Sequence, residues 1–221
     1  MPKVKICGLR DAASALAAAD AGADFLGVVF VEGVRRQVQP SDARAFVDQY
    51  RDGRQHTDAP PPKLVGLFRN QPADWVNQVV TEIGLDYVQL CGEEDEAYIS
   101  QLSTPVFRQV RVKEDASPAG LTGEVAPHLA SGRIVVLDRY DAKLPGGGGE
   151  VFDWSAAVGI AAEEHVLLAG GLTPENVRSA IDRLHPWGVD VSSGVEVNGT
   201  KDPSRIRAFV QAARGGKLPV R

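Results

Sequence analysis

The feature that most constrains this chain is a regular alternation of strand and helix signals along its whole length. Eight apolar runs of strand length are each followed by a helical pattern. We expect strands over 4–7, 24–30, 63–68, 86–90, 105–112, 133–138, 165–169 and 188–192, and helices over 11–21, 40–50, 72–83, 93–102, 117–130, 154–160, 173–184 and 202–213. Apolar strands separated by helices indicate a parallel sheet, and eight repeats favour a closed (β/α)8 TIM barrel. An open doubly wound sheet is the alternative.

The composition fits one soluble domain and argues against several classes of partner. At 221 residues, 43% hydrophobic and 24% charged, the chain is expected to form a single barrel domain over 1–221. A net charge of −5 without a basic run argues against nucleic acid and against an anionic membrane surface. Because a strand begins almost at Met1, we expect no signal peptide. Two isolated cysteines then suggest the reducing cytoplasm.

Candidate functional residues follow from the geometry of a barrel, in which function resides where the strands end and the next loops begin. This rule selects Cys7, Arg36, Cys91, Asp138 and Asp190, which end or follow the first, second, fourth, sixth and eighth strands. The four histidines fall elsewhere, two of them just before the seventh and eighth strands, at the opposite face. Their positions argue against a histidine base and against a metal site.

The first strand places two lysines and a thiol on one face. Alternation points Lys3, Lys5 and Cys7 to the same side and the apolar residues to the other. Cysteine is usually buried, so this polar face suggests a strand that lines an enclosed functional space. Cys7 could act as a base only as a thiolate, which a neighbouring Lys5 or Arg36 would stabilise. The alternative is a small buried thiol beside two exposed lysines.

Asp138 ends an otherwise apolar strand, where a carboxylate is either paired or functional. Alternation places it inward, and partial burial would raise its pKa and keep it protonated as a general acid. Lys5 also points inward and would lower that pKa if it reached Asp138. The alternative is a structural partner of Lys5 or a turn residue.

Two glycine-rich turns, Gly170-Gly171 and Ser192-Ser193-Gly194, follow the seventh and eighth strands. Barrels commonly bind phosphate there through backbone N–H groups, which glycine lets the ligand approach. We therefore expect a phosphorylated small-molecule substrate, with two ordinary tight turns as the alternative. The glycine run 146–149 lacks the residues of a P-loop and is either a lid or a plain loop. Arg36 suits a planar anion such as a carboxylate, unless it is simply solvated.

Seven segments, spread in order from residue 4 to residue 196, resemble the phosphoribosylanthranilate isomerase family of tryptophan biosynthesis. They are VKICGLR, GADFLGVVF with Arg36 after it, YVQLCGEE, VVLD, FDW, LLAGGLTPENVRSAI and VDVSSGVE. KICG and DVSSGVE in one chain are the most specific of these.

The resemblance implies the Amadori rearrangement of N-(5'-phosphoribosyl)anthranilate to 1-(2-carboxyphenylamino)-1-deoxyribulose 5-phosphate, without a cofactor or metal. It implies that Asp138 protonates the ribose ring oxygen and that Cys7 then takes the C2' proton from the resulting Schiff base. Arg36 would hold the anthranilate carboxylate, and Asp190 would lie close to the substrate. The implied phosphate ligands are Gly171, Ser192, Ser193 and Gly194.

Two positions depart from the family pattern, and two other functions stay open. Cys91 stands where the family usually has histidine, and the segment 32–36 lacks the Ser-Pro that often precedes Arg36. We expect neither change to abolish activity. The alternatives are another phosphate-binding barrel isomerase or lyase on a related sugar phosphate, and a non-catalytic binder of anionic metabolites. A mere binder needs neither an acid nor a base. The sequence leaves the oligomeric state open.

Overall fold

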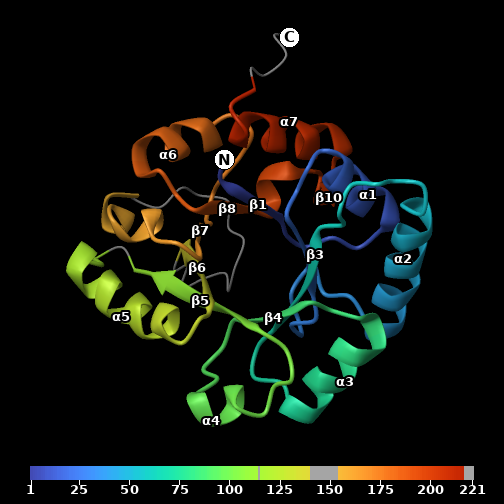
Figure 1. Ribbon diagram of the computed structural model, residues 1–221, viewed down its shortest axis with the longest axis horizontal. Helices are drawn as coiled ribbons and strands as arrows, with labels where there is room; N and C mark the ends of the chain where they lie inside the picture. The colour runs from blue at the N-terminus through green and yellow to red at the C-terminus, as the bar shows by residue number, and fades with distance from the viewer. Residues whose placement is uncertain (114, 140–153, 217–221) are drawn as a thin grey trace.

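Eight parallel strands form a closed barrel at the centre of the molecule (Figure 1). The computed structural model describes residues 1–113, 115–139 and 154–216. The barrel strands are β1 (Lys3–Ile6), β2 (Phe25–Val29), β3 (Lys63–Phe68), β4 (Tyr87–Leu90), β5 (Val106–Val112), β6 (Ile134–Arg139), β7 (Val166–Leu168) and β8 (Gly188–Val191). Because β1 pairs with both β2 and β8, the sheet closes. The predicted barrel is therefore confirmed, and the open sheet is excluded.

Helices surround the barrel, as Figure 1 shows. They are α1 (Ala12–Asp20), α2 (Pro40–Gly53), α3 (Ala73–Ile83), α4 (Glu96–Ile99), α5 (Pro118–Ala130), α6 (Val177–Leu184) and α7 (Pro203–Ala213). The described residues also include three short 3₁₀ helices: η1 (Trp154–Ala157), η2 (Ile160–Ala162) and η3 (Ser193–Val195). The last helix, α7, packs against the first, α1.

Helix α7 begins where its capping residue predicts, whereas helix α6 does not. The Asp202 carboxylate accepts a hydrogen bond from the Arg205 N–H at 2.8 Å, so α7 begins where its sequence predicts. Helix α6 was expected to begin at Thr173 but begins at Val177. The Thr173 N–H donates to the Asn176 side chain at 2.8 Å, which holds residues 173–176 in a turn before the helix.

Helix α4 is much shorter than the predicted 93–102, and the reason lies in a buried carboxylate. Glu94 accepts hydrogen bonds from the N–H groups of Asn70 (2.7 Å) and Gly92 (2.9 Å) and an ion pair from Arg108 (2.9 Å). These bonds fix the residues before Asp95 in a loop, so the helix starts only after it. The region 117–130, predicted to be poorly defined, is helical over almost its whole length.

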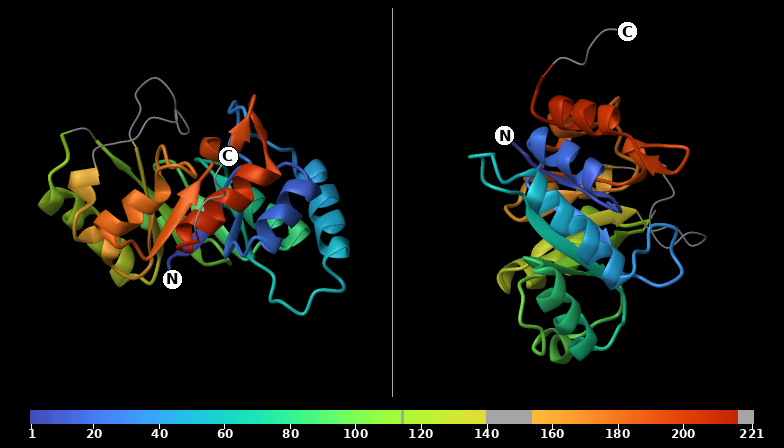
Figure 2. Two further views of the ribbon diagram at one scale, coloured as in Figure 1. Left: turned by 90° about the horizontal axis from the view of Figure 1, so that it is seen from above. Right: turned by 90° about the vertical axis from the view of Figure 1, so that its right-hand side faces the viewer.

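A short hairpin after β8 distinguishes the two ends of the barrel. Strands β9 (Glu196–Val197) and β10 (Thr200–Lys201) pair antiparallel, and the sequence did not predict them. Two-residue strands are too short to show an alternating pattern. Figure 2 places this hairpin at one end of the barrel, with the N-terminus and the connection 54–62 at the other. The carboxyl ends of the strands therefore open on the hairpin side.

The inside of the barrel combines an apolar cluster with buried polar side chains. The cluster consists of Cys7, Phe25, Val29, Val31, Val65, Leu67, Phe107, Ile134, Val136, Leu167 and Ala169. Lys5, Gln89 and Asp190 are also buried. A larger apolar core fills the space between the strands and the helices. Since packing needs no charge inside a barrel, these polar side chains mark a place built for another purpose.

Candidate active site

Cys7 follows β1 directly, at the carboxyl end of the barrel. Its N–H donates to the Val191 carbonyl at 2.8 Å, which ties the residue to the end of β8. The thiol lies over Gly27 of β2, where a Cβ would come within 2.9 Å of the sulfur. Only 6% of Cys7 is exposed. The inward orientation predicted from alternation is thus confirmed, and Gly27 provides the space that the thiol occupies.

Lys5 lies one layer below the thiol and is fully buried. Its ammonium forms an ion pair with Asp190 of β8 at 2.9 Å, across the β1–β8 pairing in which the two residues are direct neighbours. The question of whether Lys5 pairs with Asp138 is therefore answered: its partner is Asp190. The second oxygen of Asp190, Oδ1, is buried and has no hydrogen-bond partner among the described residues.

Burial and the charges around Cys7 affect the pKa of its thiol in opposite directions. Burial raises the pKa of Cys7 above its ordinary value, while Lys5 lowers it. Asp190 raises the same pKa, and Lys201 from β10 lowers it. Burial by itself lowers the pKa of Lys5, but Asp190 and Cys7 raise it overall, so Lys5 stays charged throughout the neutral range. The thiol therefore lies in a buried site that contains two cations.

Asp138 ends the inward face of β6 and is half-buried. Its Oδ2 accepts a hydrogen bond from the Gln109 side chain of β5 at 2.7 Å. Gln109 occupies an inward position two residues after Phe107, which lies in the apolar cluster. This amide orients the carboxylate from the neighbouring strand, a contact that the sequence analysis did not foresee.

Arg36 lies in the loop after β2 and is held by Glu196 of the hairpin. Its Nε donates to Glu196 Oε1 at 2.6 Å and its Nη2 to Oε2 at 3.1 Å. Gly8, with a φ of +77°, lets the arginine cross the end of β1, since a Cβ there would lie 2.5 Å from Arg36 Cδ. Arginine has five N–H donors, so the edge of the guanidinium away from Glu196 keeps donors for a second carboxylate.

Lys201 is the main site residue that sequence reasoning missed. Its ammonium donates to the Ser192 carbonyl (2.8 Å), the Ser192 hydroxyl (3.3 Å) and Glu196 Oε1 (2.9 Å). Burial lowers the pKa of Lys201, and Glu196 acts in the opposite direction. Burial works against ionisation of Glu196, but Arg36 and Lys201 lower its pKa to about 2. No sequence motif predicts Lys201, because its contacts depend on the β9–β10 hairpin, which the sequence pattern does not predict.

The two glycine-rich turns lie against each other beyond β7 and β8. Gly194 packs so closely on the first turn that a Cβ would come within 1.9 Å of the Leu172 carbonyl oxygen. Gly170 and Gly171 both have positive φ, at 88° and 67°. Among hydrogen bonds between described residues, none uses the N–H groups of Gly171 or Ser193. This is the arrangement that a bound anion requires.

Cys91, where a histidine was expected from the family pattern, follows β4 and is half-buried. Burial raises its pKa to about 12, with a further contribution from Cys7, so Cys91 remains a thiol. The Gln89 amide lies 3.7 Å from its sulfur, and Arg111 donates to its carbonyl at 3.0 Å. The position is thus occupied by a neutral group.

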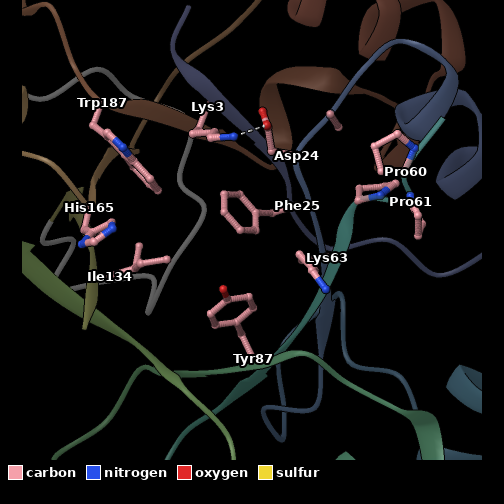
Figure 3. Close-up of a pocket in the computed structure, with 12 residues that line it drawn as sticks. Lys3, Asp24, Phe25, Pro60, Pro61, Lys63, Tyr87, Ile134, His165 and Trp187 are labelled. Atoms are coloured by element: carbon pink, nitrogen blue, oxygen red, sulfur yellow. Dashed lines mark hydrogen bonds and ion pairs between the residues drawn. The ribbon is translucent and has the colours of Figure 1, made fainter. Parts of the chain in front are cut away.

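The opposite end of the barrel also contains a pocket, of about 400 Å³, shown in Figure 3. Its lining residues are Lys3, Ala23, Asp24, Phe25, Pro60, Pro61, Pro62, Lys63, Tyr87, Ile134, His165 and Trp187. Figure 3 shows the Phe25 ring at its centre, and Lys3 paired with Asp24 at the rim. None of the predicted site residues lines it. His165 lies here, at the face predicted for it, against Trp187.

Three further observations concern metal ions, membrane spans and the glycine run 146–149. Within the described ranges, no three His, Cys, Asp or Glu side chains are grouped so that they could hold a metal ion. No helix there has the length and apolar character that a membrane span requires. The glycine run 146–149, predicted to be a lid or a plain loop, lies outside the described residues.

Comparison with known proteins identifies relatives over nearly the whole chain. The sequence profile of the N-(5'phosphoribosyl)anthranilate (PRA) isomerase family matches residues 4–212. The N-(5'-phosphoribosyl)anthranilate isomerase of Roseiflexus sp. is 42% identical over 221 aligned residues, which cover 97% of this chain and 98% of that protein. The crystal structure of phosphoribosyl anthranilate isomerase from Thermotoga maritima matches with a TM-score of 0.81 and 33% identity, over 97% and 100% of the two chains.

A second solved structure of such an isomerase was determined with a ligand. It is a complex with reduced 1-(o-carboxyphenylamino)-1-deoxyribulose 5-phosphate. It matches with a TM-score of 0.77 and 32% identity and covers 97% of this chain and 100% of that one. That ligand contains one carboxylate and one phosphate.

Proposed function

The chain belongs to the N-(5'-phosphoribosyl)anthranilate isomerase family of tryptophan biosynthesis, and we propose that Cys7 and Asp138 carry the proton transfers of its reaction. The reaction is an Amadori rearrangement that converts an aminoaldose phosphate into an aminoketose phosphate. The observation that supports this assignment is the placement of a buried thiol and an oriented carboxylate at one end of one barrel. Candidate anion sites, Arg36 and the glycine turns, lie at the same end.

The first proposed step opens the ribose ring. Asp138 gives its proton to the ring oxygen as the bond from that oxygen to C1' breaks. The electron pair of the anthranilate nitrogen forms the C1'=N bond, which produces a protonated Schiff base. The hydrogen bond from Gln109 at 2.7 Å supports this role, because it fixes the direction of the carboxyl group from the adjacent strand.

The second proposed step removes the proton from C2'. The Cys7 thiolate takes this proton. The electrons of the broken C2'–H bond form a C1'=C2' bond, and the electrons of the C1'=N double bond return to the nitrogen as its lone pair. The resulting enolamine becomes the ketone by net transfer of the 2'-hydroxyl proton to C1'. Burial raises the pKa of Cys7 overall, and two cations near the thiol, Lys5 and Lys201, offset part of that rise and so favour the thiolate.

Two anchors hold the ends of the substrate in this proposal. Arg36 binds the anthranilate carboxylate through the guanidinium edge that Glu196 leaves open. The phosphate binds the N–H groups of the turns Gly170-Gly171 and Ser192-Ser193-Gly194. Lys201 supports both anchors, because it bonds Ser192 and Glu196 at once. Asp190 lies beside Lys5, and its buried Oδ1, which has no hydrogen-bond partner among the described residues, could accept a hydrogen bond from the substrate.

The test mixes purified protein with freshly formed phosphoribosylanthranilate and follows the loss of anthranilate fluorescence. We expect rapid loss with the natural chain. In the Asp138→Asn variant we expect turnover to fall by about a hundredfold or more, because the amide cannot donate an acidic proton. Asparagine keeps a carbonyl that accepts from Gln109, so binding of the reduced product analogue should persist.

Three other results would contradict parts of this proposal. Full turnover in Asp138→Asn would remove the general-acid role from that residue. Binding of the reduced analogue without any turnover by the natural chain would favour a non-catalytic metabolite binder. Turnover of a different aminated sugar phosphate in preference to this one would favour a related barrel isomerase.

A further inference from the structure

Two lysines on the same face of β1 have different surroundings. Lys3 is paired with Asp24 at 2.9 Å, and its side chain is 46% exposed. Lys5 is paired with Asp190 at the same distance, with a side-chain exposure of 0%. Burying an ammonium group costs free energy even when it is paired. A buried lysine in the layer directly below Cys7 therefore needs an explanation that the exposed lysine does not.

The neighbours of Lys5 show where its charge acts. It points into the barrel two residues before Cys7 on the same strand face, so its ammonium and the thiol share one enclosed space. Gly27 closes that space on the β2 side, because the thiol lies directly on its Cα. A buried thiolate in such a space requires a nearby cation, since water cannot solvate it.

We propose that Lys5 is a positioning residue of the reaction, whose buried ammonium, held by Asp190, supplies the counter-charge for the Cys7 thiolate. This inference rests on the proposed base role of Cys7. Asp190 holds Lys5 in place and balances its charge while Cys7 is protonated. When Cys7 gives up its proton, the negative charge appears beside an ammonium that is already oriented, so little reorganisation is needed.

The charged and titratable groups around the thiol come from four elements. Lys5 belongs to its own strand β1, Asp190 to β8, Lys201 to β10, and Cys91 follows β4. Lys5 and Lys201 favour the thiolate, whereas Asp190 disfavours it. Cys91 stays a neutral thiol. Removal of Lys5 should therefore raise the pKa of the Cys7 thiol, whereas removal of the Asp190 charge should lower it. These opposite directions make the proposal testable.

The experiment measures the titration of Cys7 directly, in ligand-free protein. A Cys91→Ala background leaves Cys7 as the one thiol of the chain, since the sequence contains two cysteines. The thiolate is followed by its ultraviolet absorbance and by the rate of iodoacetamide alkylation across pH. The alkylation midpoint, rather than the rate itself, is compared between variants, because a substitution can also change access of the reagent.

In this background, Lys5→Met should lower the thiolate fraction at neutral pH by about tenfold or more, because the nearest cation is lost. Asp190→Asn, which keeps the side-chain volume, should move the midpoint the other way and raise that fraction. Lys3→Met is the matched control on the same strand face and should leave the midpoint unchanged. If Lys5→Met does not fold, the Asp190→Asn variant still tests the proposal, because its alkylation midpoint should move to lower pH.

Turnover measurements on the same variants separate this inference from the proposed function. We expect the kcat of Lys5→Met to fall with its thiolate fraction and to recover as pH rises, with KM little changed. A midpoint equal to that of Lys3→Met would overturn the role of Lys5 and leave the base assignment intact. A shifted midpoint with an unshifted kcat profile would instead overturn Cys7 as the base, and with it the part of Lys5 in the reaction.

Discussion

The two ends of the barrel use the same residue types for different purposes. At the amino end, Lys3 and Lys63 form partly exposed ion pairs with Asp24 and Asp86 around aromatic rings. At the carboxyl end, Lys5 and Lys201 are buried and pair with acids that are buried as well. The bond lengths are alike, between 2.8 and 2.9 Å, so burial is what differs.

This difference shows what each end contributes. An exposed ion pair contributes little to stability, because water screens it and the side chains lose entropy. A buried pair contributes little net stability but strongly affects any charge that forms beside it. The aromatic end, with Phe25 edge-on to Phe107 at 5.3 Å, stabilises the barrel. The charged end is arranged around the proposed site of chemistry. Changes at the two ends should therefore have different consequences.

The largest expected effect is on turnover, at the charged end. Cys7→Ser should reduce kcat by about a thousandfold, because an alcohol is a far weaker base than a thiolate. The free energy of unfolding should change little, since serine fits over Gly27. Single-turnover fluorescence measures the first quantity and urea denaturation the second. Near-normal turnover in this variant would place the base elsewhere.

The next effect contrasts the two lysines of β1 in stability alone. Lys5→Met should lower the free energy of unfolding by about 3 kcal/mol, because it leaves Asp190 as an unpaired buried charge. Lys3→Met should lower it by less than about 1 kcal/mol, as expected for an exposed pair. Urea denaturation of both variants at the same pH tests the contrast. Equal losses would mean that burial does not distinguish the two ends.

A change at the aromatic end should affect stability without affecting chemistry. Phe25→Ala removes the ring at the centre of the pocket in Figure 3 and should cost about 3 kcal/mol of unfolding free energy. The kcat of the protein that remains folded should stay within about twofold, because Cys7, Arg36, Asp138 and the glycine turns do not line the pocket that this ring occupies. A large fall in kcat at unchanged stability would show that the amino end also participates in the reaction.

The smallest effect concerns acid stability at the charged end. Glu196 has a pKa of about 2 in the folded protein, below its ordinary value of 4.5. A carboxylate with a depressed folded pKa stabilises the fold above its unfolded pKa, and that stabilisation is lost as pH falls towards the folded value.

Glu196→Gln should therefore remove about 1–2 kcal/mol of unfolding free energy at neutral pH. It should also flatten the decline in stability between about pH 4.5 and pH 2. Urea denaturation of the variant and the natural chain across this range provides the measurement. An equally steep decline in both proteins would assign the acid sensitivity to other carboxylates.

The comparison also shows which parts of the site could be predicted from sequence. The sequence places Cys7, Asp138 and the glycine turns at the carboxyl end of the barrel, where the structure has them, because a residue's place at the end of a barrel strand depends only on local pattern. Gln109 carried a weaker signal, as a polar residue at an inward position of an apolar strand. Lys201 carried none, because it reaches Ser192 and Glu196 through a hairpin of two-residue strands.

The start of α6 and the length of α4 were predicted wrongly for a related reason. Thr173 and Glu93 each begin a good local helix signal, but in both places a side chain inside the predicted helix accepts hydrogen bonds from backbone N–H groups before or at the helix start. The Asn176 amide takes the Thr173 N–H, and Glu94 takes two N–H groups, one of them from Asn70. The Asn176 contact is local, whereas Glu94 also depends on Asn70 and Arg108, which only the tertiary structure brings to it.

By itself, the sequence determined the barrel, the face of each strand and the residues at its carboxyl end, because these depend on periods of 2.0 and 3.6 residues and on strand order. The tertiary structure decided which charges meet. Lys5 could have paired with Asp138 or Asp190, and the β1–β8 register, which sets it beside Asp190, selected the second. Ion pairing depends on distances of a few ångströms between strands far apart in the chain. Only closure of the barrel brings those strands together.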